Sequence, residues 1–275
     1  MDSTGRMVTA DMNENPYFTE IDASGTAWVT LNRPDVHNAF DDVLIGALAA
    51  EFMALNDRDD IRAVVLRAEG KSFSAGGDLD WMRRMADYSF DENVMDANAF
   101  AGMLQALNTL NKPTIAMVQG PAFGGGVGLV ACCDIAIAAE EAVFSFSEVK
   151  LGIIPATISP YVISAIGARQ ARRYFQTAER FDADTARRIG LVHEVVKADD
   201  LRAAVDHFLT VLTGNGPGAM AASKDLVFAI ADRPISEEVL ADTAERLAAA
   251  RASDEGREGT SAFLEKRKPG WVAEG

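Results

Sequence analysis

The chain is built around the stretch Val118-Gln-Gly-Pro-Ala-Phe-Gly-Gly-Gly-Val-Gly-Leu-Val-Ala-Cys-Cys-Asp134, in which three consecutive glycines open a strongly apolar segment. Just before it, the β-branched apolar run Thr114–Val118 predicts a buried strand. From Gly124 onward the pattern predicts a buried helix whose first turn has no side chains. Bare amides of that turn, helped by the helix dipole, attract anions. Because glycines let a ligand approach the backbone closely, the stretch predicts an anion receptor made of peptide N–H groups.

The residues of this stretch leave its ligand open. Phosphate is the usual ligand of glycine-rich turns, but no Gly-Lys-Ser/Thr follows, as a P-loop requires. The dinucleotide pattern G-x-G-x-x-G, with an acidic residue after the next strand, is also missing. A simpler alternative is that the glycines only allow neighbouring helices to pack closely.

A second segment repeats the arrangement earlier in the chain. Lys71-Ser-Phe-Ser-Ala-Gly-Gly-Asp-Leu-Asp-Trp-Met82 follows the apolar run Ala63–Ala68 and leads through small residues into a predicted helix. The chain thus provides, twice, a strand, a turn with free amides and a helix start. Two such turns facing each other would hold one developing oxyanion, each donor contributing about 2.7–4 kcal/mol to transition-state stabilisation.

Composition limits the classes of protein that this chain can belong to. Its 275 residues, 48% of them hydrophobic, suit one large domain or one domain with an appendage. The net charge of −15 argues against non-specific binding to nucleic acid or anionic membranes. No apolar run is long enough to span a bilayer and no signal peptide is evident, so we expect a cytoplasmic protein. The adjacent Cys132 and Cys133 fit a buried helix in a reducing compartment, and the histidines show no metal-ligand spacing.

The order of apolar patterns along the chain predicts an α/β fold in three parts. Residues 1–15 are polar and mixed, which is typical of a loose N-terminal tail. Residues 16–198 repeat a strand–strand–helix order. After about residue 198 the strand signals end, and apolar residues recur at helical spacing. We therefore expect a core at 16–198 and a C-terminal helical region at 199–275.

Four blocks of sequence occur in a characteristic order: Asn32-Arg-Pro-Asp-Val-His-Asn-Ala39, Phe73-Ser-Ala-Gly-Gly-Asp-Leu79, Gly120-Pro-Ala-Phe-Gly-Gly-Gly126 with Cys133-Asp134, and Ser147-Glu-Val-Lys-Leu-Gly-Ile-Ile-Pro155. Together they resemble the crotonase (enoyl-CoA hydratase/isomerase) superfamily. The resemblance implies a crotonase-type spiral of β-β-α turns with a C-terminal helical trimerisation region. It also implies an acyl-CoA substrate, with coenzyme A as part of the substrate and no separate cofactor, and a homotrimer or dimer of trimers.

The same resemblance implies the catalytic groups. The backbone N–H groups of Ala75 and Gly125 are expected to bind the thioester oxygen. Glu148 matches the second of the two glutamates that hydratases of this family place across the double bond, whereas the first falls at Gly128, which has no acid–base group. Two enzymes fit a lone glutamate: a hydratase in which Glu148 both activates water and supplies the α-proton, or a double-bond isomerase. A non-catalytic CoA-binding or scaffold protein is the third interpretation.

Three runs resemble bacterial 3-methylglutaconyl-CoA hydratases of leucine breakdown and the related isohexenylglutaconyl-CoA hydratases of acyclic-terpene breakdown: 78–85, 128–134 and 154–162. Such substrates carry a second substituent on the β-carbon, and we hypothesise that Gly128 leaves room for it. They also carry a distal carboxylate, which is costly to bury without a cation. Arg83, Arg84 and Lys150 are the candidates for that cation.

The family resemblance also implies a set of substrate-binding residues: Arg33, His37, Ser74, Gly76, Asp78, Leu79, Met82, Gly124, Gly128 and Lys268. His37 belongs to the block near the coenzyme A entrance, where a ligand contact and stabilisation of the turn are both open. Lys268 lies in the basic cluster Glu265-Lys-Arg-Lys-Pro269, which is the obvious counter-charge for coenzyme A. The alternative for that cluster is a solvated surface.

Overall fold

The computed structural model describes residues 15–272, so the tail expected at 1–15 lies outside the described residues except for Asn15. The larger of its two sheets has six strands in the order β1-β2-β3-β4-β6-β9. These strands are β1 (Tyr17–Ile21), β2 (Thr26–Leu31), β3 (Ala63–Ala68), β4 (Thr114–Val118), β6 (Ile135–Ala139) and β9 (Glu194–Val196). Within this sheet, among the residues that the structure describes, only the β1–β2 pair is antiparallel. The parallel pairs require crossovers, which the helices supply.

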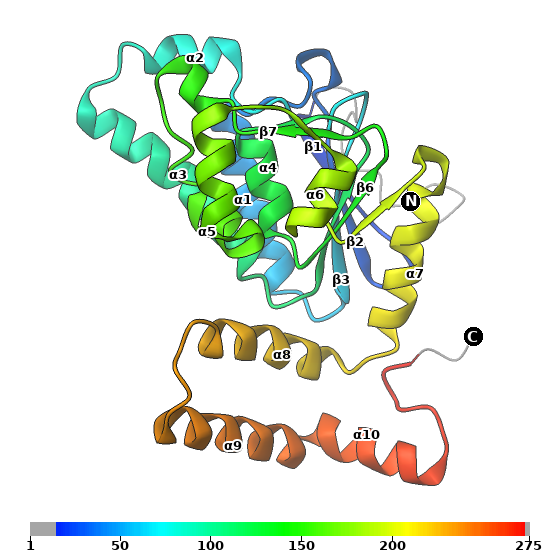
Figure 1. Cartoon of the computed structure of the whole chain (residues 1–275). Helices are drawn as coiled ribbons and strands as arrows, with labels where there is room; N and C mark the ends of the chain where they lie inside the picture. Colours follow the sequence, from blue (N-terminus) through cyan, green and yellow to red (C-terminus); the bar gives the residue numbers. More distant parts are fainter. Residues whose placement is uncertain (1–14, 273–275) are drawn as a thin grey trace.

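Helices cover both faces of this sheet (Figure 1). One face carries four helices: α1 (Asp42–Asn56), α3 (Phe90–Asn108), α4 (Gly125–Cys132) and α5 (Ser159–Thr177). The other face packs against α7 (Leu201–Thr213). Side chains alternate between the two faces of a strand. Val64 and Leu66 of β3 therefore pack into the core on the α1 side of the sheet, whereas Val65 packs into the core on the α7 side.

A small second sheet joins the two glycine-containing segments to the chain around Glu148. It consists of β5 (Ala122–Phe123), β7 (Val143–Ser145) and β8 (Phe181–Asp182), in the order β5-β7-β8. Phe123 lies opposite Ser145, and a bridge links Ser74 to Ala122. The shorter helical elements are α2 (Leu79–Met85), α6 (Ala183–Ile189), η1 (Pro34–Val36), η2 (Glu148–Leu151) and η3 (Ala198–Asp200).

Three C-terminal helices, α8 (Pro217–Ile230), α9 (Glu237–Ala252) and α10 (Asp254–Glu265), pack on one another and lie below the body in Figure 1. They expose several large apolar side chains: Val227, Phe228, Leu240, Leu247, Phe263 and Leu264. The boundary expected at residue 199 precedes α7, which covers the sheet, so the helices that stand apart begin at Pro217. Within residues 15–272, no helix combines the length and the apolar character needed to cross a membrane.

Candidate active site

The two small-residue turns lie directly against each other. The N–H of Phe123 donates to the carbonyl oxygen of Ser74 (2.8 Å), and the N–H of Phe73 donates to that of Pro121 (2.9 Å). A Cβ atom on Gly76 would lie 3.1 Å from the carbonyl oxygen of Phe123. Segments separated by almost fifty residues therefore meet at one point, as the repeated pattern predicted.

The turn around Gly124, which is the later of the two along the chain and is called the second turn below, presents a free backbone donor at the start of α4. Gly124 has φ of 50° and ψ of −119°, a conformation that strongly favours glycine, and its N–H donates to Ser145. The N–H of the next residue, Gly125, has no acceptor among residues 15–272. A Cβ atom on Gly125 would lie only 2.7 Å from Phe100 Cζ, so this position also favours glycine. Gly125 thus presents the free N–H that was expected of it.

In the first turn, around Ser74, the structure corrects the expectation that the N–H of Ala75 binds the thioester oxygen. Its N–H donates to the carbonyl oxygen of His37 (2.9 Å) and is therefore already engaged. Phe40 exchanges hydrogen bonds with the peptide groups on either side of Gly77, both at 2.7 Å. In the described part of the chain, the N–H of Gly77 itself has no acceptor. The free donor of this turn is Gly77, because the position of residues 37–40 determines which amides are used.

Glu148 brings a carboxyl group to the second turn. It is the first residue of η2 and follows β7 closely. A Cβ atom on Gly124 would lie 3.0 Å from Glu148 Oε1. The other oxygen, Oε2, is buried and has no hydrogen-bond partner in residues 15–272. Burial raises the pKa of the Glu148 carboxyl, which makes its protonated form easier to reach than that of an exposed glutamate.

Gly128 does not leave an empty space beside the site. A Cβ atom there would lie 2.3 Å from Ile158 Cγ2 and 3.6 Å from Leu104 Cδ2. Ile158, only 1% exposed, therefore occupies the volume that a side chain at position 128 would need. The hypothesis that Gly128 makes room for a substrate branch is corrected by this contact. The sequence gives no local signal for it, because Ile158 comes from a loop 30 residues later.

Arg33 and Asp78 hold the first turn in place. The Arg33 guanidinium pairs with Asp78 (3.1 Å) and Asp41 (3.0 Å) and donates to the carbonyl oxygen of Ala39. Asp78 also caps α2 by accepting from the N–H of Asp80. Although burial opposes it, these backbone donors and Arg33 lower the pKa of Asp78. Both expected substrate-binding residues are thus occupied by contacts within the chain.

His37 and its neighbour Asn38 form a left-handed turn, with φ of 54° and 53°. His37 is exposed, and its Nδ1 lies 3.1 Å from the Ser72 hydroxyl. Asn38 is fully buried; its side chain accepts from the N–H of Arg33 and donates to the carbonyl oxygens of Glu69 and Ser72. Of the two roles left open for this block, a ligand contact and stabilisation of the turn, Asn38 has the second, and asparagine tolerates the left-handed backbone that the turn requires.

The remaining expected binding residues divide between the site and the surface. Ser74 is fully buried, and Met82 Cγ would lie 3.5 Å from a Cβ on Gly77. Leu79 is 67% exposed at the start of α2. Lys268 is exposed beyond α10, which packs on α8 and α9, so within one chain it does not join the site.

The candidate cations for a distal carboxylate differ in their partners. Arg83 pairs with Asp80, and Arg84 pairs with Asp42, both on the surface. Lys150, in η2 beside Glu148, is exposed and makes no ion pair with any residue in the range 15–272. Lys150 is therefore the least engaged of the three.

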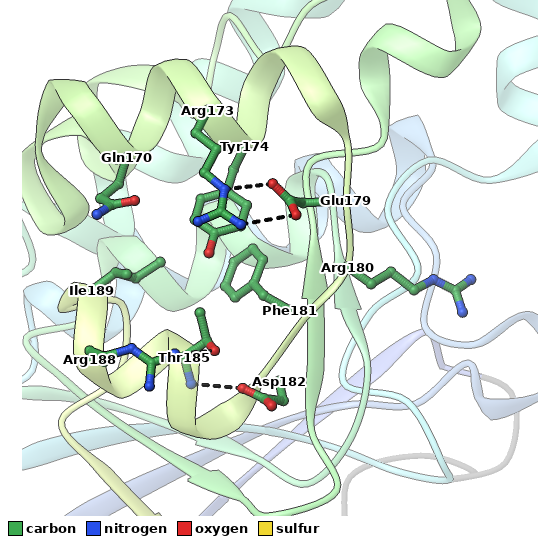
Figure 2. Close-up of a pocket in the computed structure, with 10 residues that line it drawn as sticks. All are labelled: Gln170, Arg173, Tyr174, Glu179, Arg180, Phe181, Asp182, Thr185, Arg188 and Ile189. Atoms are coloured by element: carbon green, nitrogen blue, oxygen red, sulfur yellow. Dashed lines mark hydrogen bonds and ion pairs between the residues drawn. The ribbon is translucent and has the colours of Figure 1, made fainter.

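A separate polar pocket of about 350 Å³ lies between α5, β8 and α6 (Figure 2). Its arginines are largely engaged: Arg173 pairs with Glu179 (2.7 Å), and Arg188 donates to the Thr185 hydroxyl. Arg180 extends away from the pocket and stacks over a phenylalanine ring of β5. No residue that the sequence assigned to the site lines this pocket. Among residues 15–272 there is also no group of three or more His, Cys, Asp or Glu that could hold a metal ion.

The sequence and the fold of this chain are similar to those of known proteins. A family model described as enoyl-CoA hydratase/isomerase matches residues 22–274. The probable enoyl-CoA hydratase echA8 of Mycobacterium tuberculosis is 36% identical, over 88% of this chain and 92% of its own. The crystal structure of an enoyl-CoA hydratase from Shewanella pealeana has a TM-score of 0.91 at 45% identity, covering 95% of this chain and 100% of that one. Pseudomonas aeruginosa AtuE has a TM-score of 0.90 at 38% identity, covering 94% and 100%.

Proposed function

The chain belongs to the enoyl-CoA hydratase/isomerase family, and on that premise we propose that it adds water across the 2,3 double bond of a branched enoyl-CoA of the 3-methylglutaconyl-CoA type. One observation carries the catalytic part of the proposal. One oxygen of the Glu148 carboxyl, Oε2, is buried with no hydrogen-bond partner among residues 15–272, and the other, Oε1, lies against a glycine turn that offers a free N–H. An unpaired buried carboxyl is costly unless it serves a function.

Two backbone donors support an oxyanion hole. The N–H groups of Gly77 and Gly125 are both free of acceptors in residues 15–272 and belong to turns in direct contact. The thioester oxygen would accept from both as negative charge develops on it. Each such donor stabilises the transition state by about 2.7–4 kcal/mol. Polarising the thioester makes the β-carbon electrophilic and the α-carbon basic in the resulting enolate.

Glu148 then carries the proton. Its carboxylate takes a proton from water while the water oxygen bonds to the β-carbon, and the double-bond electrons move toward the thioester oxygen. The protonated Glu148 returns a proton to the α-carbon as the enolate collapses. The carboxyl ends in its initial state, and the substrate has gained one H and one OH. General acid–base catalysis of this kind contributes about 10²–10⁴-fold.

A double-bond isomerase is the second candidate, favoured by the same lone carboxyl. In that reaction Glu148 would remove a proton from the α-carbon of a 3-enoyl thioester and return it to the γ-carbon. The oxyanion hole would hold the same dienolate oxygen. Hydration needs space for water beside Glu148, whereas isomerisation does not, so the two reactions are separated by their products.

The branched substrate rests on the resemblance of three runs, 78–85, 128–134 and 154–162. Because Ile158 fills the space beside Gly128, the branch of the substrate would have to be accommodated elsewhere in the site. Lys150 is our candidate for the distal carboxylate, because Arg83 and Arg84 already pair with aspartates. Replacing Lys150 with Gln should then raise KM for 3-methylglutaconyl-CoA more than for crotonyl-CoA.

We further propose that the chain works as a homotrimer or dimer of trimers in the cytoplasm. Exposed apolar side chains on α8–α10, such as Phe263 (82% exposed) and Leu264 (72%), support burial against other copies. Sedimentation equilibrium of the full chain measures the assembly directly. A monomer at micromolar concentration would contradict it.

The enzyme assay follows the enoyl-thioester absorbance when the protein meets 3-methylglutaconyl-CoA and crotonyl-CoA. Hydration predicts loss of absorbance with the branched substrate preferred, and Glu148→Gln should lower kcat about 10²–10⁴-fold. A gain of absorbance from a 3-enoyl-CoA, with no hydration, would identify the isomerase instead. If neither reaction occurs while acyl-CoA still binds, the chain is a CoA-binding or scaffold protein.

A further inference from the structure

Side chains of three helices form successive layers that lead away from the glycine turns. In the layer nearest the turns, Phe100 of α3 contacts the position of a Cβ on Gly125 of α4 (2.7 Å). In the next layer, Leu104 of α3 and Ile158 at the start of α5 surround Gly128 of α4. Residues separated by three or four positions share one face of a helix. The same faces of α3 and α4 therefore continue from the oxyanion donor to Ile158.

A cavity occupies the third layer. It has a volume of about 310 Å³, and its lining includes Asn108, Ala131 and Tyr161. Each of these residues lies three or four positions beyond a member of the second layer. From the helical rise, Ala131 lies about 9 Å along α4 from Gly125, a distance that a medium-length acyl chain spans. Phe228 of α8 also lines the cavity.

Ile158 lies beside Gly128, three positions before Tyr161, which lines the cavity. Its side chain is 1% exposed and fills the space beside Gly128. Its carbonyl oxygen accepts from the N–H of Val162, and the N–H of Ser159 donates to the carbonyl oxygen of Ala156, so both sides of the residue are held by the first turn of α5. The backbone of Ile158 is therefore held by the first turn of α5, and its buried side chain packs against α4.

We propose that Ile158 is a specificity-determining residue, which limits the length of the acyl chain by separating the catalytic turn from the cavity between α3, α4 and α5. The proposal rests on acyl-CoA being the ligand, as in the proposed function. The acyl chain runs from the thioester at Gly125 along the α4 face and ends at Ile158. Shortening Ile158 joins the two spaces, and each additional buried methylene of the substrate then adds to binding.

The test compares Ile158→Ala and Ile158→Val with Val162→Ala in the full chain. Val162 is fully buried one turn along α5 and contributes none of the three atoms nearest to a Cβ on Gly128, so it controls for a general loss of core packing. Calorimetry measures the affinities of butanoyl-CoA, octanoyl-CoA and dodecanoyl-CoA, which do not react. The relative kcat/KM for the corresponding 2-enoyl-CoAs is measured in parallel.

Ile158→Ala should shift the dodecanoyl-to-butanoyl affinity ratio in favour of the long chain by about tenfold or more, which corresponds to a few newly buried methylenes. Ile158→Val should shift it in the same direction by less, and Val162→Ala should leave it unchanged. Adding Ala131→Leu to Ile158→Ala should reverse the shift by filling the cavity. An unchanged ratio in folded Ile158→Ala and Ile158→Val would overturn the proposal, as would an equal shift in Val162→Ala.

The readouts separate this proposal from the proposed function. Turnover of enoyl-CoA with no change in the chain-length ratio rejects the role of Ile158 and leaves the function intact. A shifted affinity ratio in a protein that turns over no enoyl-CoA rejects the function and retains the role of Ile158.

Discussion

Each of the two glycine-containing turns provides a free N–H, Gly77 in the first and Gly125 in the second, but these two donors are held in different ways. The donor of the second turn, Gly125, begins α4, and its availability follows from local chain order because the first amides of any helix lack intrahelical acceptors. The donor of the first turn, Gly77, is free only because Phe40 takes the peptide groups on either side of it and His37 takes the N–H of Ala75. A donor at a helix start is visible in the sequence, whereas a donor left over from pairing with a distant segment is not.

The difference between the two turns predicts the largest effect on kcat for replacements at Gly77. Gly77→Pro removes the N–H and should lower kcat about 10²–10³-fold. Gly77→Ala keeps the N–H, and its Cβ would meet side-chain atoms of Trp81 and Met82 no closer than 3.5 Å, so it should retain most activity. Steady-state kinetics on crotonyl-CoA, with thermal unfolding to check folding, makes the measurement. Equal activity of the two variants would assign the first donor to another amide.

Asn38 tests whether the first turn depends on distant side chains. Asn38→Ala leaves the carbonyl oxygens of Glu69 and Ser72 without this donor. The free energy of unfolding should fall by about 1–3 kcal/mol, and kcat should fall because Gly77 is displaced. Urea unfolding and kinetics measure the two effects. A loss of stability with unchanged kcat would show that the turn holds its shape without this anchor.

The second turn differs from the first in carrying the carboxyl of Glu148, and this difference predicts a pH dependence. The base form is needed, so kcat/KM should fall about tenfold per pH unit below the pKa of Glu148. Because burial raises that pKa, the fall should begin above the range of an ordinary glutamate. A pH profile with the midpoint of an exposed glutamate would contradict the assignment.

The smallest expected effect is that of Glu148→Gln on the stability of the folded protein. A carboxyl whose pKa is raised by folding contributes its stability in the protonated form, and that stability is lost as the pH rises through the folded pKa. Glu148→Gln should therefore be more stable than the native protein at neutral pH, by less than about 1 kcal/mol because the group is only partly shielded from water. The advantage should vanish at acid pH. Urea unfolding at neutral and acid pH measures the free energy of unfolding of both proteins. A Glu148→Gln protein less stable than the native protein at neutral pH would contradict a raised pKa of Glu148.

Much of the fold followed from sequence patterns. The strand before the triple glycine, the buried helix after it and the earlier turn around Ser74 all lie where periodicity and small residues placed them. The family match over residues 22–274 confirms the crotonase resemblance drawn from four blocks. What failed depended on contacts between distant segments: Ala75 is engaged by His37, and the space at Gly128 is filled by Ile158.

Side-chain pairing accounts for the other differences. Arg33 carries a charge that suits a ligand, but Asp41 and Asp78 neutralise it, and neither partner is identified by spacing alone. Lys268 lies just beyond α10, which packs on α8 and α9, and the spacing of the basic cluster does not predict that position. Local patterns therefore predict where a backbone donor or a carboxyl arises, and tertiary contacts determine which groups remain free.

A crystal structure of the Glu148→Gln protein with crotonyl-CoA bound tests the central claim most directly. We predict that the thioester oxygen accepts hydrogen bonds from the N–H groups of Gly77 and Gly125, with the side chain at position 148 beside the double bond. A thioester oxygen bound to other donors, or an acyl chain lying away from α4, would contradict it.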